Sequence, residues 1–138
     1  MSRIINIYID IEPDQNQELN NIHIDNISVV PNYSINKILL QDAQKIEENK
    51  VNKLLTEIMT KLTMGGEIII SFIDFNSLCY DYLNKILTDK ETMKYIHTIK
   101  NILSFKTIES ILDNRLFRIA KIDKNKYNSI ITIERIQL

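Results

Sequence analysis

The segment from residue 67 to residue 72, EIIISF, constrains the fold of this chain most strongly. It is a nearly continuous apolar run that contains three consecutive isoleucines. β-Branched side chains favour strands, and a strand that is apolar on both faces is typical of a parallel sheet with helices on both sides. The run therefore predicts a central strand of a parallel α/β sheet, buried on both faces.

A helical pattern precedes this run. Between Asp42 and Leu62, apolar residues recur every three or four positions, which predicts an amphipathic helix that ends before Gly65. Gly65 and Gly66 are the two glycines of the chain. Glycine readily takes the left-handed conformation that closes a helix, so we expect this pair to form the turn from the helix to the strand.

Further strands are expected towards both ends of the chain. Residues 3–12 and 22–30 alternate apolar and polar positions, as strands do, and residues 38–41 form a short apolar run of the kind found in buried strands. Residues 116–124 and 128–138 also have strand character and are separated by a short polar turn. This last pair predicts an antiparallel hairpin at the edge of the sheet.

Three more helices are predicted from the spacing of apolar residues, over 76–87, 90–103 and 104–114. We expect Asn76 or Ser77 to cap the first of them, and Ser104 or Thr107 to lie near the start of the last. Strands that alternate with helices in this order predict an α/β fold with a mainly parallel sheet. We interpret residues 1–138 as a single domain.

Composition argues against several classes of protein. The formal net charge is −1 over 138 residues, so the chain has no bulk attraction to nucleic acid or to an anionic membrane. No stretch approaches the roughly 18 apolar residues of a membrane-spanning helix. Cys79 is the single cysteine, which precludes an internal disulfide and fits a reducing compartment. We therefore expect a cytoplasmic protein that binds neither nucleic acid nor membrane.

The choice of residues also bears on the origin of the chain. Isoleucine, asparagine and lysine are all abundant, which suggests an AT-rich genome. AT-rich codon use and small size would suit a virus or phage protein. A virion-associated protein is therefore the alternative to a cytoplasmic one.

Few residues are arranged for metal binding. His23 and His97 are far apart, with no cysteine or histidine at metal-ligand spacing, so we interpret both as surface or hydrogen-bonded histidines. Asp10, Glu12 and Asp14 form an acidic cluster that could bind a hard cation. We favour the alternative, a solvated strand end, and predict no metal site.

Several segments, taken in order, carry a family resemblance. Residues 55–78 contain a helix, a Gly-Gly-Glu turn, an apolar strand and the pair Asp74-Phe75, with Ile73 at the position of a proline. This segment resembles the class I S-adenosylmethionine-dependent methyltransferases, and the Asp-Phe pair resembles their sugar-modifying branch. Residues 31–46 and 104–123 resemble other parts of the family, and the final hairpin resembles its last two strands. The resemblance implies a reduced Rossmann-like methyltransferase fold.

The first strand departs from the family's pattern. There the family has a glycine-rich loop, whose glycines let the backbone approach the cofactor closely. In this chain Tyr8 and Asp10 align with two of those glycines. A tyrosine would fill space that the cofactor needs, and Asp10 would lie near the cofactor's carboxylate. Two like charges about 4 Å apart cost about 4 kcal/mol at an effective dielectric constant of about 20.

Other aligned residues give the cofactor-site prediction. Asp25 resembles the second-strand acid that holds the ribose hydroxyls, although an ordinary strand-end or turn aspartate is the alternative. Asp74 lies at the carboxyl end of its strand, where open α/β sheets place ligands. If S-adenosylmethionine binds, the resemblance implies Asp25, Asp10 and Asp74 as its contacts. Asn36 replaces the usual acid of one motif and Lys45 lies near the position of a histidine, so no catalytic residue is predicted.

Two functional hypotheses follow. The first is a degenerate, catalytically inactive methyltransferase-like domain that binds no cofactor. It would act as a binding, scaffold or structural subunit, with a protein partner or a second copy of itself. The alternative is an active S-adenosylmethionine-dependent methyltransferase of a small molecule or sugar, with an atypical cofactor loop.

Overall fold

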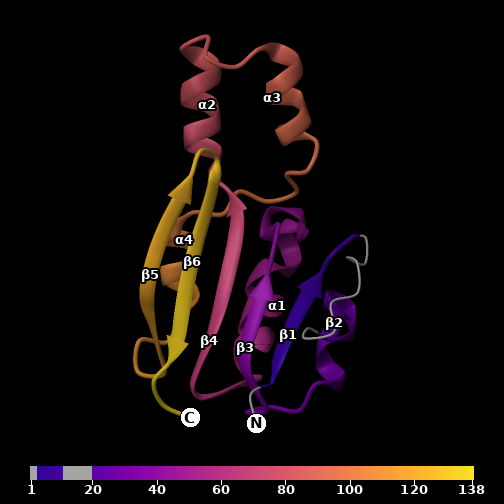
Figure 1. Cartoon of the computed structure of the whole chain (residues 1–138), viewed down its shortest axis with the longest axis vertical. Coiled ribbons are helices and arrows are strands. Elements are labelled where there is room, and N and C mark those ends of the chain that lie inside the picture. The colour runs from indigo at the N-terminus through magenta and orange to yellow at the C-terminus, as the bar shows by residue number, and fades with distance from the viewer. Residues whose placement is uncertain (1–2, 11–19) are drawn as a thin grey trace.

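The computed structural model describes residues 3–10 and 20–138. Its strands form one sheet in the order β2-β1-β3-β4-β6-β5, which Figure 1 shows from one face. The strands are β1 (Ile4–Tyr8), β2 (Asn20–His23), β3 (Ile35–Leu40), β4 (Leu62–Ile73), β5 (Phe117–Asn125) and β6 (Asn128–Arg135). The first four are parallel, and β6 runs antiparallel to both β4 and β5. The predicted α/β class, with a mainly parallel sheet and a C-terminal hairpin, is confirmed.

The helices are short. The α-helices are α1 (Val51–Met59), α2 (Phe75–Leu83), α3 (Asp89–Ile96) and α4 (Phe105–Ile111), and the 3-10 helices are η1 (Ile24–Val29), η2 (Ala43–Lys45) and η3 (Glu48–Lys50). Ser104 caps α4, as predicted. The predicted cap of α2 is wrong, because Asp74 accepts hydrogen bonds from the backbone N–H groups of both Asn76 and Ser77. None of the helices in the described ranges is long and apolar enough to cross a membrane.

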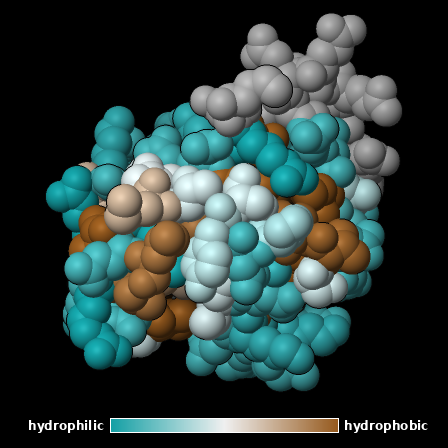
Figure 2. Space-filling view, turned by 90° about the horizontal axis from the view of Figure 1, so that it is seen from below, coloured by the Kyte–Doolittle hydropathy of each residue, from teal (hydrophilic) through white to brown (hydrophobic). Residues whose placement is uncertain are grey.

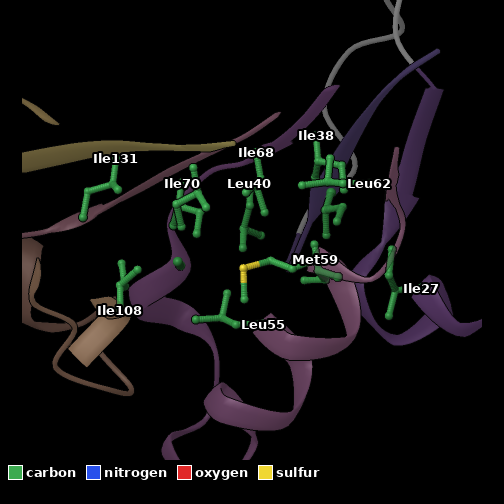
Figure 3. Packing of buried hydrophobic residues seen from close by; sticks show 14 of the residues in the cluster. Ile27, Ile38, Leu40, Leu55, Met59, Leu62, Ile68, Ile70, Ile108 and Ile131 are labelled. Atoms are coloured by element: carbon green, nitrogen blue, oxygen red, sulfur yellow. The ribbon is translucent and has the colours of Figure 1, made fainter. Parts of the chain in front are cut away.

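The main core lies between one face of the sheet and the helices α1 and α4. Figure 3 shows side chains of both helices pointing towards side chains of the strands. The helix residues are Leu55, Met59 and Ile108, and the strand residues include Leu40, Ile68, Ile70 and Ile131. Alternate residues of β1, β3, β4 and β6 supply the sheet side of this core. Isoleucine dominates it, which suits strands because a β-branched side chain has few rotamers to lose.

The opposite face of the sheet is polar. In register across it, Lys37 faces Glu67, Glu67 faces Glu134, and Glu134 faces Arg118. Ile69 on the same face of β4 is only partly buried. The prediction that this strand is buried on both faces is therefore wrong, since only the face carrying Ile68 and Ile70 is fully buried.

Two segments change their predicted type of secondary structure, and the predicted helix 90–103 ends early, at Ile96. The predicted strand 22–30 ends at His23 and continues as η1, because Ile24, Ile27 and Val30 are buried at a spacing of three, which suits a 3-10 helix. The predicted helix from Asp42 becomes η2, η3 and the shorter α1. Asp42 has a φ of 57°, and this left-handed residue starts the irregular stretch.

The two glycines lie within β4 and not at the end of a helix. Helix α1 already ends at Met59. β4 bulges against β3, since Ile35 pairs with Leu62 whereas Lys37 pairs with Glu67. Gly65 has a φ of 77°, and a Cβ at Gly66 would lie 3.0 Å from a backbone oxygen of β4 and 3.1 Å from a backbone oxygen of β3. Both glycines therefore shape this bulge.

Helices α2 and α3 project beyond the end of the sheet, at the top of Figure 1. A small second cluster of buried residues joins them to the hairpin turn through Ile73, Leu78 and Tyr127. This α2–α3 arm, residues 75–97, also exposes large apolar side chains, namely Tyr80, Tyr82, Leu83, Ile86, Met93 and Ile96. The opposite end of the molecule, seen in Figure 2, is a mosaic of hydrophilic and hydrophobic residues.

Candidate functional site

The carboxyl ends of the four parallel strands meet at one edge of the sheet. The chain passes from β1 to β2 on one side, and β3 then pairs with β1 on the other side. The topological switch point therefore lies between β1 and β3. Ligands of open α/β sheets bind in the crevice outside the strands' carboxyl ends, at such a point. The site is therefore built from the residues that follow these strands.

A lysine and two carboxylates occupy the switch point. Asp10 follows β1, Asp42 follows β3, and Lys45 is the last residue of η2. Lys45 Nζ lies 3.2 Å from Asp10 Oδ2 and 3.9 Å from Asp42 Oδ2. Partly exposed ion pairs of this kind contribute at most about 1 kcal/mol to stability. Their importance here is positional, because they span the gap between the ends of β1 and β3.

An aromatic pair closes the neighbouring gap, between β1 and β2. Tyr8 and His23 pack edge to face, with ring centroids 5.2 Å apart and an interplanar angle of 82°. His23 Nε2 lies 2.9 Å from the carbonyl oxygen of Ile9, and Nδ1 accepts a hydrogen bond from the backbone N–H of Asp25. Because Nδ1 accepts, Nε2 is the ring nitrogen that can donate to the Ile9 carbonyl oxygen. The interpretation of His23 as a hydrogen-bonded histidine is confirmed.

Among the described residues, three cavities open along this edge. One of about 200 Å³ lies by the ends of β1 and β2, and its lining includes Asp10, His23 and Asp25. A second, of about 160 Å³, lies between β1 and β3 and includes Tyr8 and Asp10. The third, of about 550 Å³, lies by the ends of β3 and β4, and Tyr95 of α3 forms part of its wall. Lys45 lines all three cavities.

The structure brings two of the three predicted contacts together. Asp10 and Asp25 line the same 200 Å³ cavity, and Asp25 keeps 73% of its side chain exposed. Glu12 and Asp14 of the predicted acidic cluster lie outside the described residues. Within residues 3–10 and 20–138, no group of three or more histidine, cysteine or acidic side chains is placed to hold a metal ion.

Asp74 lies apart from these two, at the carboxyl end of β4, and has structural contacts. Its carboxylate caps α2 and lies 2.7 Å from Lys124 Nζ in the terminal hairpin. Burial alone would raise the pKa of this carboxyl group. Hydrogen bonds from Lys124 and Ser77, together with the charge of Lys124, outweigh burial and hold the pKa of Asp74 below its ordinary value.

Sequence reasoning missed Gln44, which organises the wall of the 550 Å³ cavity. Its side chain is 1% exposed, and its Oε1 accepts a hydrogen bond from the N–H of Ile73 at 3.2 Å. Its backbone oxygen accepts hydrogen bonds from the N–H groups of Lys100 and Asn101. Gln44 thus joins η2 to β4 and to the segment before α4. A polar residue in a polar stretch gives no sequence signal of this burial.

Comparison with solved structures identifies the fold. A methyltransferase from Archaeoglobus fulgidus superposes with a TM-score of 0.65 and 14% sequence identity, covering 96% of this chain and 86% of its own. One from Mesorhizobium loti gives 0.61 and 12%, covering 96% and 90%. The plantazolicin methyltransferase BpumL, solved in complex with SAH (S-adenosylhomocysteine), gives 0.67 and 14%, covering 97% and 76%. The chain has a class I methyltransferase-like fold.

This likeness establishes the fold alone. No family model matches the sequence, and a search of curated proteins finds no related sequence. The edge formed by Asp10, Asp25 and Lys45 lies at the topological switch point, where open α/β sheets bind their ligands. The 200 Å³ cavity there is smaller than the roughly 300–1,000 Å³ typical of small-molecule sites. Tyr8 and Asp10 already contact His23 and Lys45 at this place.

Proposed function

We propose that this protein is a catalytically inactive, methyltransferase-like binding subunit that does not bind S-adenosylmethionine. One observation carries the proposal: the end of β1 presents Tyr8 and Asp10, both engaged by neighbouring side chains. A site that takes a dinucleotide-like cofactor against the backbone uses glycine there, because any side chain holds the ligand away. The connection from β1 to β2 contains no glycine, since Gly65 and Gly66 are the chain's two.

Electrostatics support the same conclusion. The amino-acid part of S-adenosylmethionine carries a carboxylate, which would lie near Asp10 if it occupied the family's position. Binding would require the cofactor to separate Asp10 from Lys45, whose charged groups lie 3.2 Å apart. A loss of about 1.4 kcal/mol already lowers affinity tenfold. Breaking this pair and adding a like charge both act against binding.

Calorimetric titration with S-adenosylmethionine and S-adenosylhomocysteine tests the proposal directly. We expect no binding heat at millimolar ligand concentration. The positive control is a methyltransferase that binds both ligands, titrated in the same buffer. Binding at micromolar concentration would contradict the proposal and would justify a search for a methyl acceptor.

The binding role is assigned to the α2–α3 arm, with a second copy of this chain as the partner. Clustered exposed apolar side chains mark interaction surfaces, and Leu83 in this arm is 76% exposed. The arm carries three acids and three lysines, so two copies would not repel one another. In α3, Asp89 and Glu91 lie in the first turn and Lys94 in the last, so antiparallel packing of two α3 helices pairs opposite charges.

Sedimentation velocity over a range of concentrations tests this partner. We expect a dimer that Leu83→Asp weakens at least tenfold. Val29→Asp is a matched control, because Val29 is equally exposed, at 76%, but lies in η1 outside the arm. A monomer at all concentrations, or equal weakening by both substitutions, would contradict self-association through the arm.

An active methyltransferase is the second candidate, favoured by the 550 Å³ cavity at the ends of β3 and β4. That volume falls within the roughly 300–1,000 Å³ of small-molecule sites. Asp25 would hold the ribose of the cofactor in this case, since its carboxylate is largely exposed. If the wild type binds cofactor, Asp25→Ala should weaken binding at least tenfold. Unchanged affinity would exclude this role for Asp25.

A further inference from the structure

Among the described residues, Lys45 is the one that lines all three cavities at the carboxyl ends of the strands. Asp10 lines the cavities of about 200 and 160 Å³, and Asp42 lines those of about 160 and 550 Å³. Lys45 and its two carboxylate partners therefore lie where spaces of about 200, 160 and 550 Å³ come together along the strand ends.

The backbone holds Lys45 in this position. Asp42 turns the chain sharply out of β3 with a φ of 57°, and η2 begins directly after it. Ala43 and Gln44 are buried, so they anchor this helix on the sheet. Lys45 donates its backbone N–H to Asp42 O at 2.9 Å, and its side chain is only 26% exposed. Its stem therefore packs within the crevice instead of extending into solvent.

We infer that Lys45 is an internal plug that divides a single ligand-sized crevice and occupies the place of a bound cation. The inference rests on the proposed function, because it gives the reason why the wild type binds no cofactor. Without the lysine side chain, the crevice would join the three cavities and present the carboxylates of Asp10 and Asp42. Its walls would also include the apolar residues Ile9 and Ile73. Such a crevice suits an organic cation with an aromatic or apolar body.

The test is calorimetric titration of Lys45→Ala with S-adenosylmethionine, a sulfonium cation, and with S-adenosylhomocysteine, which lacks that charge. We expect Lys45→Ala to bind S-adenosylmethionine at least tenfold more tightly than the wild type does. We also expect S-adenosylmethionine to bind this variant more tightly than S-adenosylhomocysteine, because the freed carboxylates of Asp10 and Asp42 attract the sulfonium charge. The repulsion between Asp10 and the ligand carboxylate is the same for both ligands and cancels in this comparison. Exposed ion pairs contribute little to folding, so the variant should fold, and a thermal melt checks this.

Two further variants separate volume from charge. Lys45→Met keeps a long side chain without the ammonium group, so the crevice should stay closed and affinity should match that of the wild type. Lys50→Ala is the matched control, because Lys50 lines the 200 Å³ cavity but pairs with Glu47, at 4.0 Å. Lys50→Ala should also bind like the wild type.

The outcomes distinguish this inference from the proposed function. Tight binding by the wild type would contradict the proposed function, and the plug with it. No gain in a folded Lys45→Ala, while the wild type also fails to bind, would overturn the plug alone. An equal gain in Lys45→Met or in Lys50→Ala would also overturn it, since neither change opens the crevice at the switch point.

Discussion

The Tyr127 hydroxyl donates a hydrogen bond to Asp81 Oδ2 at 2.8 Å, which links the β5–β6 turn to helix α2. The ring of Tyr127 also packs edge to face against Tyr95 of α3, with centroids 5.1 Å apart. One side chain thus connects the hairpin to both helices of the arm. The hydrogen bond to Asp81, together with burial and the negative charge of Asp81, raises the pKa of Tyr127 to about 12.

Tyr127→Phe should reduce the free energy of unfolding by about 1–2 kcal/mol, because it removes a hydrogen bond to a charged acceptor. Urea unfolding followed by circular dichroism measures the change. Tyr80→Phe is the control, since Tyr80 is 65% exposed and should change stability by less than about 0.5 kcal/mol. Equal effects of the two substitutions would refute the linking role of Tyr127.

The same hydrogen bond predicts a dependence on alkaline pH. Because the folded-state pKa of Tyr127 is raised from about 10 to about 12, its contribution is fully present below pH about 10. It should be lost as the pH rises from about 10 through 12. The hydrogen bond to Asp89 raises the pKa of Tyr82 as well, so the titration compares Tyr82→Phe with Tyr82→Phe/Tyr127→Phe. Tyrosinate absorbance should show a late phase in the first variant that the second lacks. A late phase that persists in the double variant would assign it to another tyrosine.

Asp74 should matter through both its cap and its charge. Asp74→Ala should lower the free energy of unfolding by about 1–2 kcal/mol, because it removes the N-cap of α2. Asp74→Asn keeps a capping oxygen and loses only the charge that faces Lys124. Since the folded-state pKa of Asp74 is lowered, its contribution is present above pH about 4 and is lost as the pH falls further. The wild-type stability should therefore approach that of Asp74→Asn in acid, and a constant difference between them down to pH about 2 would contradict this.

The two glycines should respond differently to alanine. Gly66→Ala should cost about 1–3 kcal/mol, because its Cβ would press against backbone oxygens of Thr63 and Asn36. Gly65→Ala has open space around its Cβ, so steric contact adds nothing. The substitution should lower the free energy of unfolding by roughly 1–2 kcal/mol, because an L-residue is strained in the left-handed conformation. Gly65→Asn should recover part of that loss, since asparagine tolerates this conformation, whereas Gly66→Asn should not recover. Recovery at both positions would show that space is not limiting at Gly66.

The polar face of the sheet contains two opposed acids. Glu67 and Glu134 face each other across β4 and β6, with Lys37 3.6 Å from the first and Arg118 2.9 Å from the second. Lys37→Ala should lower the free energy of unfolding by about 0.5–1 kcal/mol, because Glu67 and Glu134 lose one neutralising cation. Lys37→Ala combined with Glu67→Gln should recover that loss. If the double variant is no more stable than Lys37→Ala, repulsion between the acids is not the cause.

The fold was predictable where one residue pattern dominates. The isoleucine run of β4 and the two strands of the C-terminal hairpin have strong local signals, and all three segments are strands, although only one face of β4 is fully buried. The segments 24–29 and 42–50 were not predicted, because short 3-10 helices bury residues at spacings that also fit strands or longer helices.

The candidate site was predictable only in part. Asp10 and Asp25 lie within the segments predicted as strands, 3–12 and 22–30, and the family resemblance singled them out as cofactor contacts. The partners of Asp10 depend on how β3 and η2 lie beside β1, which no local pattern encodes. Lys45 and Gln44 acquire their roles from that packing, so the sequence gives no direct sign of either.

The separation of the buried residues into two clusters has a consequence for motion. The arm is held by the small cluster around Ile73, Leu78 and Tyr127, whereas the buried residues of β4 before Ile73 belong to the large one. Regions with few buried contacts open at lower free energy than the global transition. Backbone amides of α2 and α3 should therefore exchange with deuterium while those of β4 remain protected. The arm should unfold locally and refold many times between two global unfolding events of the sheet.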